Sequence, residues 1–366
     1  MENELISNAI LKHYSSSPTS SGVERKSNEI TPLTISDKVT HDCHVGFYIV
    51  FKPPIPSNEV LKDALSKVLV HYPHLAGRFL VDNLGGPCIV LNNAGVRIVE
   101  TYFPDILAGQ LPFDTSKDSS HLLLPVKGVK ELCQIQLNRY ACGGLVLGFT
   151  VHHRVADGLS IFCSFFVSWS RMVRGLDIPY HDRFTVSQPR NPPRVEFDHG
   201  SIEFKKTTIN LDITKGISSS SLETVIINYP IEFINKLKVM VNNNPDQRYS
   251  THMYGRRYFK SFIDFGAVEY QGGELQETIP ELGSSLCPNL EVDSCLGFPI
   301  HDIGFGSGSP CAIIHPNSPF EGLLVFTPAC TEDGGVDVKL TLFAKHVSLF
   351  KKIAHSVDTK LSCSSL

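Results

Sequence analysis

The hydrophobic and polar positions in the first half of the chain repeat with clear periods. Residues 45–51 are apolar at every second position, which predicts a β-strand with one face against a core. After Ser57, a candidate N-cap, apolar residues recur at intervals of four until Pro73, and this spacing predicts an amphipathic helix. Residues 133–138 and 145–152 flank a Cys-Gly-Gly turn, so we expect a β-hairpin there.

The later segments continue a pattern of strands and helices. Residues 159–173 are apolar around much of the helical circumference, which is typical of a helix packed under a sheet. Residues 233–241 and 347–357 predict two further helices. Residues 323–327 and 336–342 flank an Asp-Gly-Gly turn, which favours a second hairpin. We therefore expect a sheet with helices in each half of the chain.

Residues 176–227 differ in composition from the segments on either side. Four prolines, scattered charges and a run of serines over 218–221 are typical of a connecting segment. A chain of 366 residues also suits two domains that share one interface. We expect an N-terminal domain over residues 1–175 and a C-terminal domain over residues 228–366, with a crossover linker between them.

Composition and charge narrow the class of protein. Hydrophobic residues make up 42% of the chain and charged residues 19%, which is typical of a globular protein. Lys and Arg number 33 against 37 Asp and Glu, without a basic block, so the electrostatic field that nucleic-acid binding needs is missing. No apolar run approaches the roughly 20 residues that span a bilayer, which argues against a membrane protein.

The cysteines and the N-terminal residues indicate in which cellular compartment we expect the protein. Ten cysteines occur without a Cys-x-x-Cys pair, as expected for free thiols in a reducing environment. The first residues hold no basic segment followed by an apolar core, so a secretory leader is not predicted. We expect a cytoplasmic monomer whose partners are small molecules.

The segment that holds the candidate catalytic residues lies at the end of the predicted strand 145–152. The letters VHHRVADG place His153 at the end of that strand and Asp157 four residues later, where a helix begins. An imidazole with an ordinary pKa near 6.5 can take a proton from an alcohol or amine, and the carboxylate can orient the ring or brace the loop. From these residues alone, a capping aspartate and a structural histidine are the more common case.

Other candidate sites carry less weight. His41, Asp42 and His44 are metal ligands by residue type, but no closing half of a four-ligand set is visible, so we expect no metal site. The glycine-rich segment 304–308 resembles a phosphate loop yet has no following lysine. Cys163 lies on the apolar helix and is interpreted as a core residue.

Two motifs together resemble a known family. HHRVADG and the segment 302–306 (DIGFG) are similar to the signatures HxxxDG and DFGWG of the plant BAHD acyl-CoA-dependent acyltransferases. Further stretches resemble the branch that includes agmatine and tryptamine hydroxycinnamoyltransferases: 73–77 (PHLAG), 141–149 (ACGGLVLGF), 201–205 (SIEFK), 258–265 (YFKSFIDF) and 290–294 (LEVDS). The resemblance covers nearly the whole chain in the same order.

The resemblance implies a fold and a reaction. The fold would be α/β, with two chloramphenicol-acetyltransferase-like domains, each a mixed sheet flanked by helices, and the site in a tunnel between them. The reaction would be acyl transfer from an acyl-CoA co-substrate, carrying a hydroxycinnamoyl group, to an amine such as agmatine. No permanently bound cofactor, metal or acyl-enzyme is expected. The alternatives are O-acylation of shikimate or quinate, and an inactive truncated paralogue.

The resemblance also assigns roles to residues. His153 would be the general base, while Asp157 would hold the loop through a salt bridge to an arginine. Asp302, Gly304 and Gly306 would be structural. Asp293 is a candidate for binding the distal guanidinium of agmatine, and a solvated aspartate at the end of a strand is an equally common alternative.

The chain departs from the family pattern at three places. Ser294-Cys295 stands where the family has Ser-Trp, and the second motif is DIGFG. Only residues 252–257 lie between Ser250-Thr251 and the segment 258–265, where family members carry a long block with a helix and a strand. The chain therefore resembles a family member with an internal deletion near residues 250–258. That block normally supplies the arginine partner of the motif aspartate, for which Arg256 or Arg257 would have to substitute.

Overall fold

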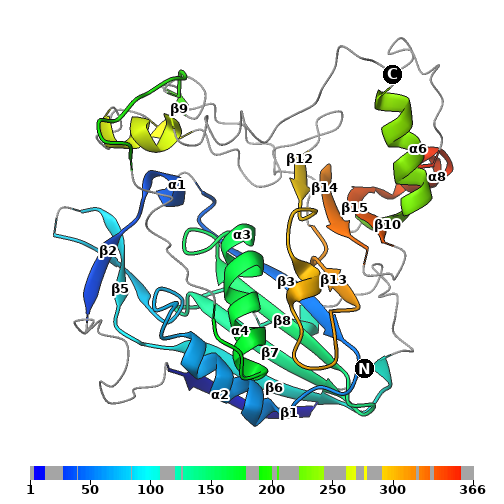
Figure 1. Ribbon diagram of the computed structural model, residues 1–366, viewed down its shortest axis with the longest axis horizontal. Helices are drawn as coiled ribbons and strands as arrows, with labels where there is room; N and C mark the ends of the chain where they lie inside the picture. The colour runs from blue at the N-terminus through cyan, green and yellow to red at the C-terminus, as the bar shows by residue number, and fades with distance from the viewer. Residues whose placement is uncertain are drawn as a thin grey trace.

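The computed structural model describes most of the chain as strands, helices and ordered connections (Figure 1). The described residues are 4–12, 28–38, 40–83, 85–107, 120–124, 127–178, 189–199, 204–205, 222–242, 261–268, 276–277, 291–318, 321–329 and 334–355. Most of the expected linker 176–227 and the whole segment 250–258 lie outside these ranges, so the predicted domain boundaries stay predictions.

The larger sheet has six strands in the order β1-β6-β7-β8-β3-β13. Its strands are β1 (Glu4–Leu11), β3 (His44–Phe51), β6 (Val96–Phe103), β7 (Cys133–Tyr140), β8 (Leu145–His152) and β13 (Ala312–Ile314). β6 and β7 run parallel and every other neighbouring pair is antiparallel, so the sheet is mixed. The hairpin predicted over 133–152 is the β7-β8 pair.

Strand β3 differs from its prediction because both of its faces are buried. Phe47 and Ile49 belong to the main core, and Tyr48 and Val50 belong to a second cluster on the other face. The alternation of apolar residues over 45–51 predicted one buried face only. A strand at the centre of a sheet that is covered on both sides reads as a continuous apolar run, and VGFYIVF is such a run.

Helices cover the face of this sheet that holds the main core (Figure 1). They are α2 (Asn58–Val68), α3 (Gly158–Ser160), the π-helix Ile161–Phe165 and α4 (Phe166–Val173). Ser57 caps α2 as expected, since its side chain accepts a hydrogen bond from the Val60 N–H. The indole N–H of Trp169 donates to the Leu61 carbonyl at 3.0 Å and ties α4 to α2.

The second sheet has four strands in the order β10-β15-β14-β12. These are β10 (Leu222–Pro230), β12 (Glu291–Ser294), β14 (Leu323–Pro328) and β15 (Gly335–Phe343), with the helices α6 (Ile231–Asn242) and α8 (Ala344–Ile353) beside them. β12 and β14 are parallel and the other pairs antiparallel. The expected hairpin 323–342 is present, and α8 starts and ends a few residues before the predicted helix 347–357.

A segment from the C-terminal half joins the first sheet. Phe298, the 3₁₀ turn Ile300–Asp302 and Phe305 pack into the main core, and β13 pairs with β3. The chain thus returns to the larger sheet between β12 and β14. Two mixed sheets flanked by helices confirm the predicted fold class.

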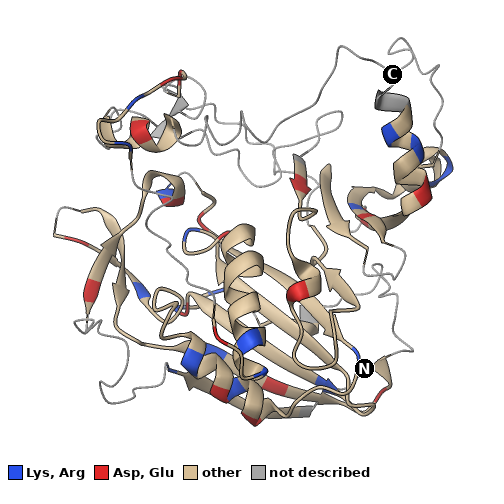
Figure 2. Cartoon of the chain, viewed as in Figure 1, with Lys and Arg blue, Asp and Glu red and all other residues tan. Residues whose placement is uncertain are grey.

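Smaller elements complete the described part. β2 (Glu29–Pro32), β4 (Arg78–Val81) and β5 (Pro87–Leu91) form a three-stranded sheet, and β9 (Phe204–Lys205) pairs with β11 (Gln276–Glu277). The remaining helical turns are α1 (Ile35–Lys38), a 3₁₀ turn (Ser120–Leu122) and residues 261–268. Basic and acidic residues are interspersed along α2 (Figure 2). Within the described ranges, no helix has the length and apolarity to cross a bilayer.

Candidate active site

His153 is the first residue after strand β8. Its backbone N–H donates to the Cys43 carbonyl at 2.8 Å, which fixes the start of the loop. The ring atom Nδ1 is buried and has no hydrogen-bond partner in the described part of the chain. The other nitrogen, Nε2, is not enclosed in this way and makes no hydrogen bond to a described residue. The free nitrogen of this imidazole is therefore available to a bound molecule.

The neighbouring His152 has a different environment. Its Nε2 lies 3.2 Å from Oδ1 of Asp42, and its ring packs against the rings of Phe79 and His44 at 4.6 and 4.9 Å. Burial, together with the nearby His44, lowers the pKa of His152 to about 4. His152 is thus a neutral, structural histidine at physiological pH.

Residues 40–44 brace the loop that follows β8. Arg154 reaches Oδ2 of Asp42 with Nη1 at 3.2 Å and the Thr40 carbonyl with Nε at 3.2 Å. His44 Nε2 lies 3.0 Å from the Glu131 carbonyl. The residues that were weighed as metal ligands therefore contact the loop and its neighbours. The described residues contain no group of three side chains that could hold a metal ion.

Asp157 caps the short helix α3. Its carboxylate accepts a hydrogen bond from the Ser160 N–H at 2.7 Å, and the Ser160 hydroxyl accepts one from the Asp157 N–H at 3.0 Å. This reciprocal pair is a capping box. Asp157 forms no ion pair with any described residue. Arg256 and Arg257, the expected partners, lie outside the described ranges, so the salt bridge stays a prediction.

The packing around position 158 explains why a glycine follows Asp157. A Cβ atom at this position would lie 2.7 Å from the ring of Phe298, closer than real Cβ contacts allow. Phe298 also stacks on Phe162 with ring centroids 5.1 Å apart. The loop after β8 and the segment before the second motif therefore pack directly on each other.

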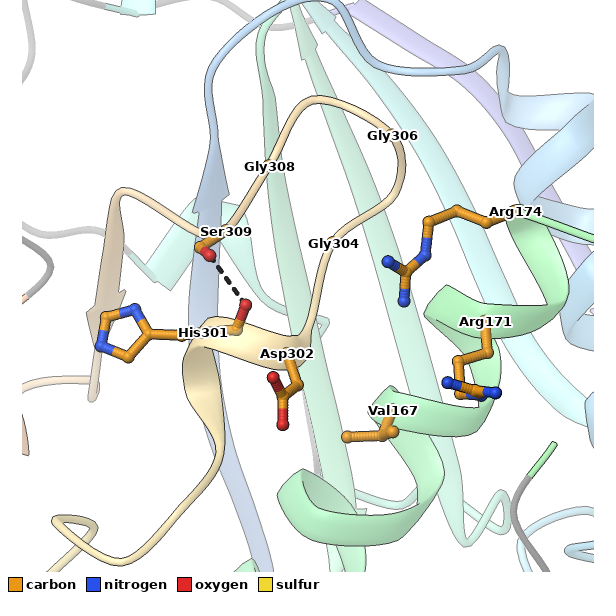
Figure 3. Close-up of a pocket in the computed structure, with 9 residues that line it drawn as sticks. All are labelled: Val167, Arg171, Arg174, His301, Asp302, Gly304, Gly306, Gly308 and Ser309. Carbon is orange, nitrogen blue, oxygen red and sulfur yellow. Dashed lines mark hydrogen bonds between the residues drawn. The ribbon is translucent and has the colours of Figure 1, made fainter. Parts of the chain in front are cut away.

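The second motif forms one wall of a cavity of about 450 Å³ (Figure 3). Asp302, Gly304 and Gly306 line it from the loop, Arg171 lines it from α4, and Arg174 lines it from the C-cap position of that helix. These arginines lie at the opposite end of the helical segment 158–173 from Asp157. The structure thus brings Asp302, Gly304 and Gly306 together, but at a distance along the helix from His153.

This loop is rigidly attached to the core. Phe305 is fully buried and packs against Phe51 and Trp169, each with ring centroids 5.0 Å apart. A side chain at Gly304 would place its Cβ 2.7 Å from the Gly308 carbonyl oxygen. These contacts hold the loop in place, and the structural role expected for Asp302, Gly304 and Gly306 stays a prediction. The arginines of the cavity were not identified from the sequence, because charges at helical spacing usually indicate a solvated face.

Asp293 lies on β12 in the second sheet. Its carboxylate is exposed and accepts a hydrogen bond from the Ser294 N–H at 2.8 Å. It is in register with Val325 on β14, which is in register with Lys339 on β15, so the three side chains share one face of the sheet. No described contact joins Asp293 to His153.

Next to Asp293, a buried lysine fixes the chain after β13. Lys339 donates hydrogen bonds to the carbonyls of His315 and Pro316. Burial lowers the pKa of Lys339 to about 7 and, with Lys339 nearby, that of His315 to about 4. Cys295 packs its Sγ 3.7 Å from Nε2 of His315.

Comparison with known proteins identifies relatives along most of the chain. A family model described as Transferase family matches residues 21–252, which include His153 and Asp157. Tryptamine hydroxycinnamoyltransferase 2 of Oryza sativa subsp. japonica is 33% identical, with 89% of this chain and 93% of that protein aligned. Agmatine coumaroyltransferase-1 of Hordeum vulgare is 32% identical, with 90% and 94% aligned.

The length of the same alignments shows a deficit in this chain. The alignment with the rice protein runs over 407 residues, although only 89% of the 366 residues take part, so about 80 aligned positions of the relative have no counterpart here. The alignment lengths do not place these positions along the chain, so a deletion near residues 250–258 stays a prediction.

Solved structures share the fold. The crystal structure of vinorine synthase has a TM-score of 0.63 at 17% identity and covers 96% of this chain and 98% of its own. TRI101 of F. graminearum, complexed with coenzyme A and deoxynivalenol, has a TM-score of 0.66 at 12% identity, with 88% and 97% covered.

Proposed function

The chain belongs to the Transferase family of BAHD acyl-CoA-dependent acyltransferases, and from that premise we propose that it transfers a hydroxycinnamoyl group from its CoA thioester to an amine. Agmatine is the acceptor we favour. An acyl-CoA is the co-substrate, and no permanently bound cofactor is required. The observation that carries the proposal is His153, whose Nε2 is open to a bound molecule at the end of β8.

In this reaction His153 acts as a general base. The amine nitrogen attacks the thioester carbonyl, and its proton passes to Nε2 of His153. The tetrahedral intermediate collapses when the carbon–sulfur bond breaks, and the imidazolium returns the proton to the leaving CoA thiolate. The products are an amide and free CoA. For Nε2 to accept a proton, the imidazole hydrogen must reside on Nδ1.

Direct transfer is favoured over an acyl-enzyme because the described thiols near this region resist ionisation. Burial raises the pKa of Cys43, whose carbonyl accepts a hydrogen bond from the His153 N–H, and that of Cys163 on the helical segment that follows. Since the thiolate is the nucleophilic form of cysteine, neither side chain is activated to attack a thioester.

Asp293 is proposed to select an acceptor with a second positive charge. The support is its exposed carboxylate, whose nearest described donor is the backbone of Ser294. The Asp293→Asn variant is expected to raise the KM for agmatine by roughly three- to tenfold, the range of an exposed charge-assisted contact. The KM for tryptamine, which has no second cation, is the control and stays unchanged. An equal effect on both amines would assign Asp293 to a solvated strand end.

A second candidate is a family member that has lost turnover. The specific observation in its favour is the absence of about 80 positions that aligned relatives contain. Supporting shells of side chains hold a catalytic group in its productive geometry, so a large deletion affects the rate first.

One assay separates these functions. Purified protein is mixed with coumaroyl-CoA and, in turn, agmatine, tryptamine, putrescine, shikimate and quinate, and thiol release and product mass are followed. Amide formation with an amine supports the proposal. Ester formation with shikimate or quinate would replace it with O-acylation, and the absence of any product would favour the inactive form. Size-exclusion chromatography and fractionation test the proposed cytoplasmic monomer.

A further inference from the structure

We propose that the cavity between α4 and the loop over residues 302–309 binds a phosphate-bearing ligand, with Arg171 and Arg174 supplying the positive charge (Figure 3). The cavity lies at the end of the helical segment opposite His153 and adds a binding site to the proposed transferase. Its volume of about 450 Å³ is that of a small-molecule pocket and exceeds what a single ion fills.

The two arginines have hydrogen-bond donors that no described residue uses. Nε of Arg171 donates to the Asp177 carbonyl at 2.6 Å, and Nε of Arg174 donates to the Ser170 carbonyl at 3.1 Å. The Nη groups of both side chains make no hydrogen bond or ion pair within the described part of the chain. Figure 3 shows the guanidinium group of Arg174 extending toward the loop that carries Gly304 and Gly306, and that of Arg171 lying against the helix on the same side of the cavity. Each is therefore fixed at Nε and leaves its terminal nitrogens for a ligand.

The charges at the cavity do not cancel. Asp302 is the acidic residue of the lining, and its carboxylate pairs with neither arginine. The imidazole of His301 points away from the arginines in Figure 3. Two guanidinium groups against one carboxylate leave an excess positive charge, which an anionic group would neutralise.

The loop offers backbone donors in a rigid frame. Gly304 and Gly308 have no acceptor for their N–H groups among the described residues, and Gly306 likewise has none. The Ser309 hydroxyl donates to the His301 carbonyl at 2.7 Å and closes the loop. Gly306 and Gly308 have φ values of 116° and 95°, and open space lies where their side chains would be. Because nothing covers the backbone at these positions, an oxygen-rich group can approach it closely.

A phosphate fits this set of donors better than a single carboxylate does. Arg171 and Arg174 are three residues apart, so both reach from one face of the helix. A phosphate ester presents three terminal oxygens, enough to accept from two guanidinium forks and a backbone N–H together. The phosphate has two possible sources, which are CoA and a free phosphate or nucleotide.

Equilibrium titration calorimetry on the full chain tests the site without any need for turnover. The ligands are CoA, dephospho-CoA, pantetheine, ADP and inorganic phosphate, each with the parent protein and the double variant Arg171→Gln/Arg174→Gln. We expect the double variant to lose roughly tenfold or more in affinity for at least one phosphate ligand, with binding that weakens as salt rises. Pantetheine, which has no phosphate, is expected to bind both proteins equally.

The set of ligands for which the double variant loses affinity identifies the phosphate group that the cavity binds. A loss for CoA alone assigns the 3′-phosphate, and a loss for CoA and dephospho-CoA together assigns the diphosphate. A loss confined to ADP or inorganic phosphate assigns a free anion. Equal affinities of parent and double variant for every ligand would overturn the site.

Three further variants separate the effect of the arginine charges on binding from any effect of the substitutions on folding. The Arg171→Lys/Arg174→Lys variant keeps the charge and is expected to retain part of the affinity. Arg97→Gln, which removes a half-buried arginine from β6, outside the cavity, leaves all affinities unchanged. Asp302→Asn removes the opposing carboxylate and is expected to strengthen phosphate binding. These binding measurements do not depend on acyl transfer. An inactive chain that binds the anion would still support this site. An active chain that does not bind the anion would overturn this site and leave the proposed transferase function standing.

Discussion

Two adjacent histidines at the end of β8 have different surroundings. His152 is enclosed by Asp42, His44 and Phe79, and its burial favours the neutral form. His153 leaves Nε2 open to a bound molecule. The sequence His-His does not distinguish them, and the resemblance to the family motif was needed to select His153.

At His153, the expected outcome of the His153→Ala substitution is loss of turnover with retention of the fold. Removal of a general base typically lowers the rate by about 10² to 10⁴, whereas the ring fills no part of the main core. The measurements are kcat with coumaroyl-CoA and agmatine, and the melting temperature. His355→Ala, just after α8 and beside β10 of the second sheet, is the matched control. Equal kcat in His153→Ala and the parent would remove His153 from the mechanism.

The buried histidines predict acid sensitivity. The folded pKa values of His152 and His315 are lowered to about 4 from 6.5, so the unfolded chain binds more protons between these values. Stability is therefore fully present above pH 6.5 and falls as the pH decreases toward 4, by up to about 1.4 kcal/mol per pH unit for each group. Urea unfolding at pH 7, 6 and 5 measures this. The His152→Gln variant is expected to show a shallower decline, and a flat profile in the parent would contradict the assignment.

At the scale of elements, hydrophobic periods predicted the structure wherever contacts are local. Both hairpins and the amphipathic helix after Ser57 follow from alternation and four-residue spacing. The helix expected over 159–173 is divided by the π-helix Ile161–Phe165, which changes the hydrogen-bond pattern without changing the apolar content. Tyr72 stabilises this region, since its hydroxyl lies 2.7 Å from Ser164 and 2.9 Å from Ser168. No sequence signal marks that contact.

The cap of α3 gives the prediction that separates a structural from a catalytic Asp157. The Asp157→Ala variant loses the side-chain acceptor for the Ser160 N–H and is expected to lose about 1 kcal/mol of stability, with activity falling alongside it. Asp157→Asn keeps an acceptor oxygen and most of the stability. Urea unfolding and kcat are measured on both variants. Lost activity with parent-like stability in Asp157→Ala would point to a direct catalytic role instead.

Over the whole molecule, the sequence predicted two mixed sheets but not how the chain passes between them. β13 pairs with β3, far away in sequence, and a three-residue apolar strand does not indicate its partner. The cavity beside the second motif was missed for the same reason. Arg171 and Arg174 line a cavity only because Ile303 and Phe305 are buried in the core and hold the loop in place on the opposite side of that cavity.

The helices beside the second sheet expose large apolar side chains. On these helices, Val239, Leu349 and Ile353 are 62%, 60% and 48% exposed, so their apolar surface faces solvent. Each Å² of lost burial costs roughly 25 cal/mol, against a typical total stability of about 5 to 15 kcal/mol. A few hundred Å² left uncovered would remove much of that stability.

We therefore expect this chain to express poorly or aggregate, to bind CoA weakly, and to turn over far more slowly than a version in which the block of a relative is inserted between residues 251 and 258. The physical reason is that the inserted helix and strand would cover apolar surface and supply the arginine partner of Asp157. Light scattering, CoA titration and kcat on the two proteins measure the three effects. A soluble, monomeric parent with turnover equal to that of the restored version would contradict this expectation, and would mean that Arg256 or Arg257 and the short connection complete the site unaided.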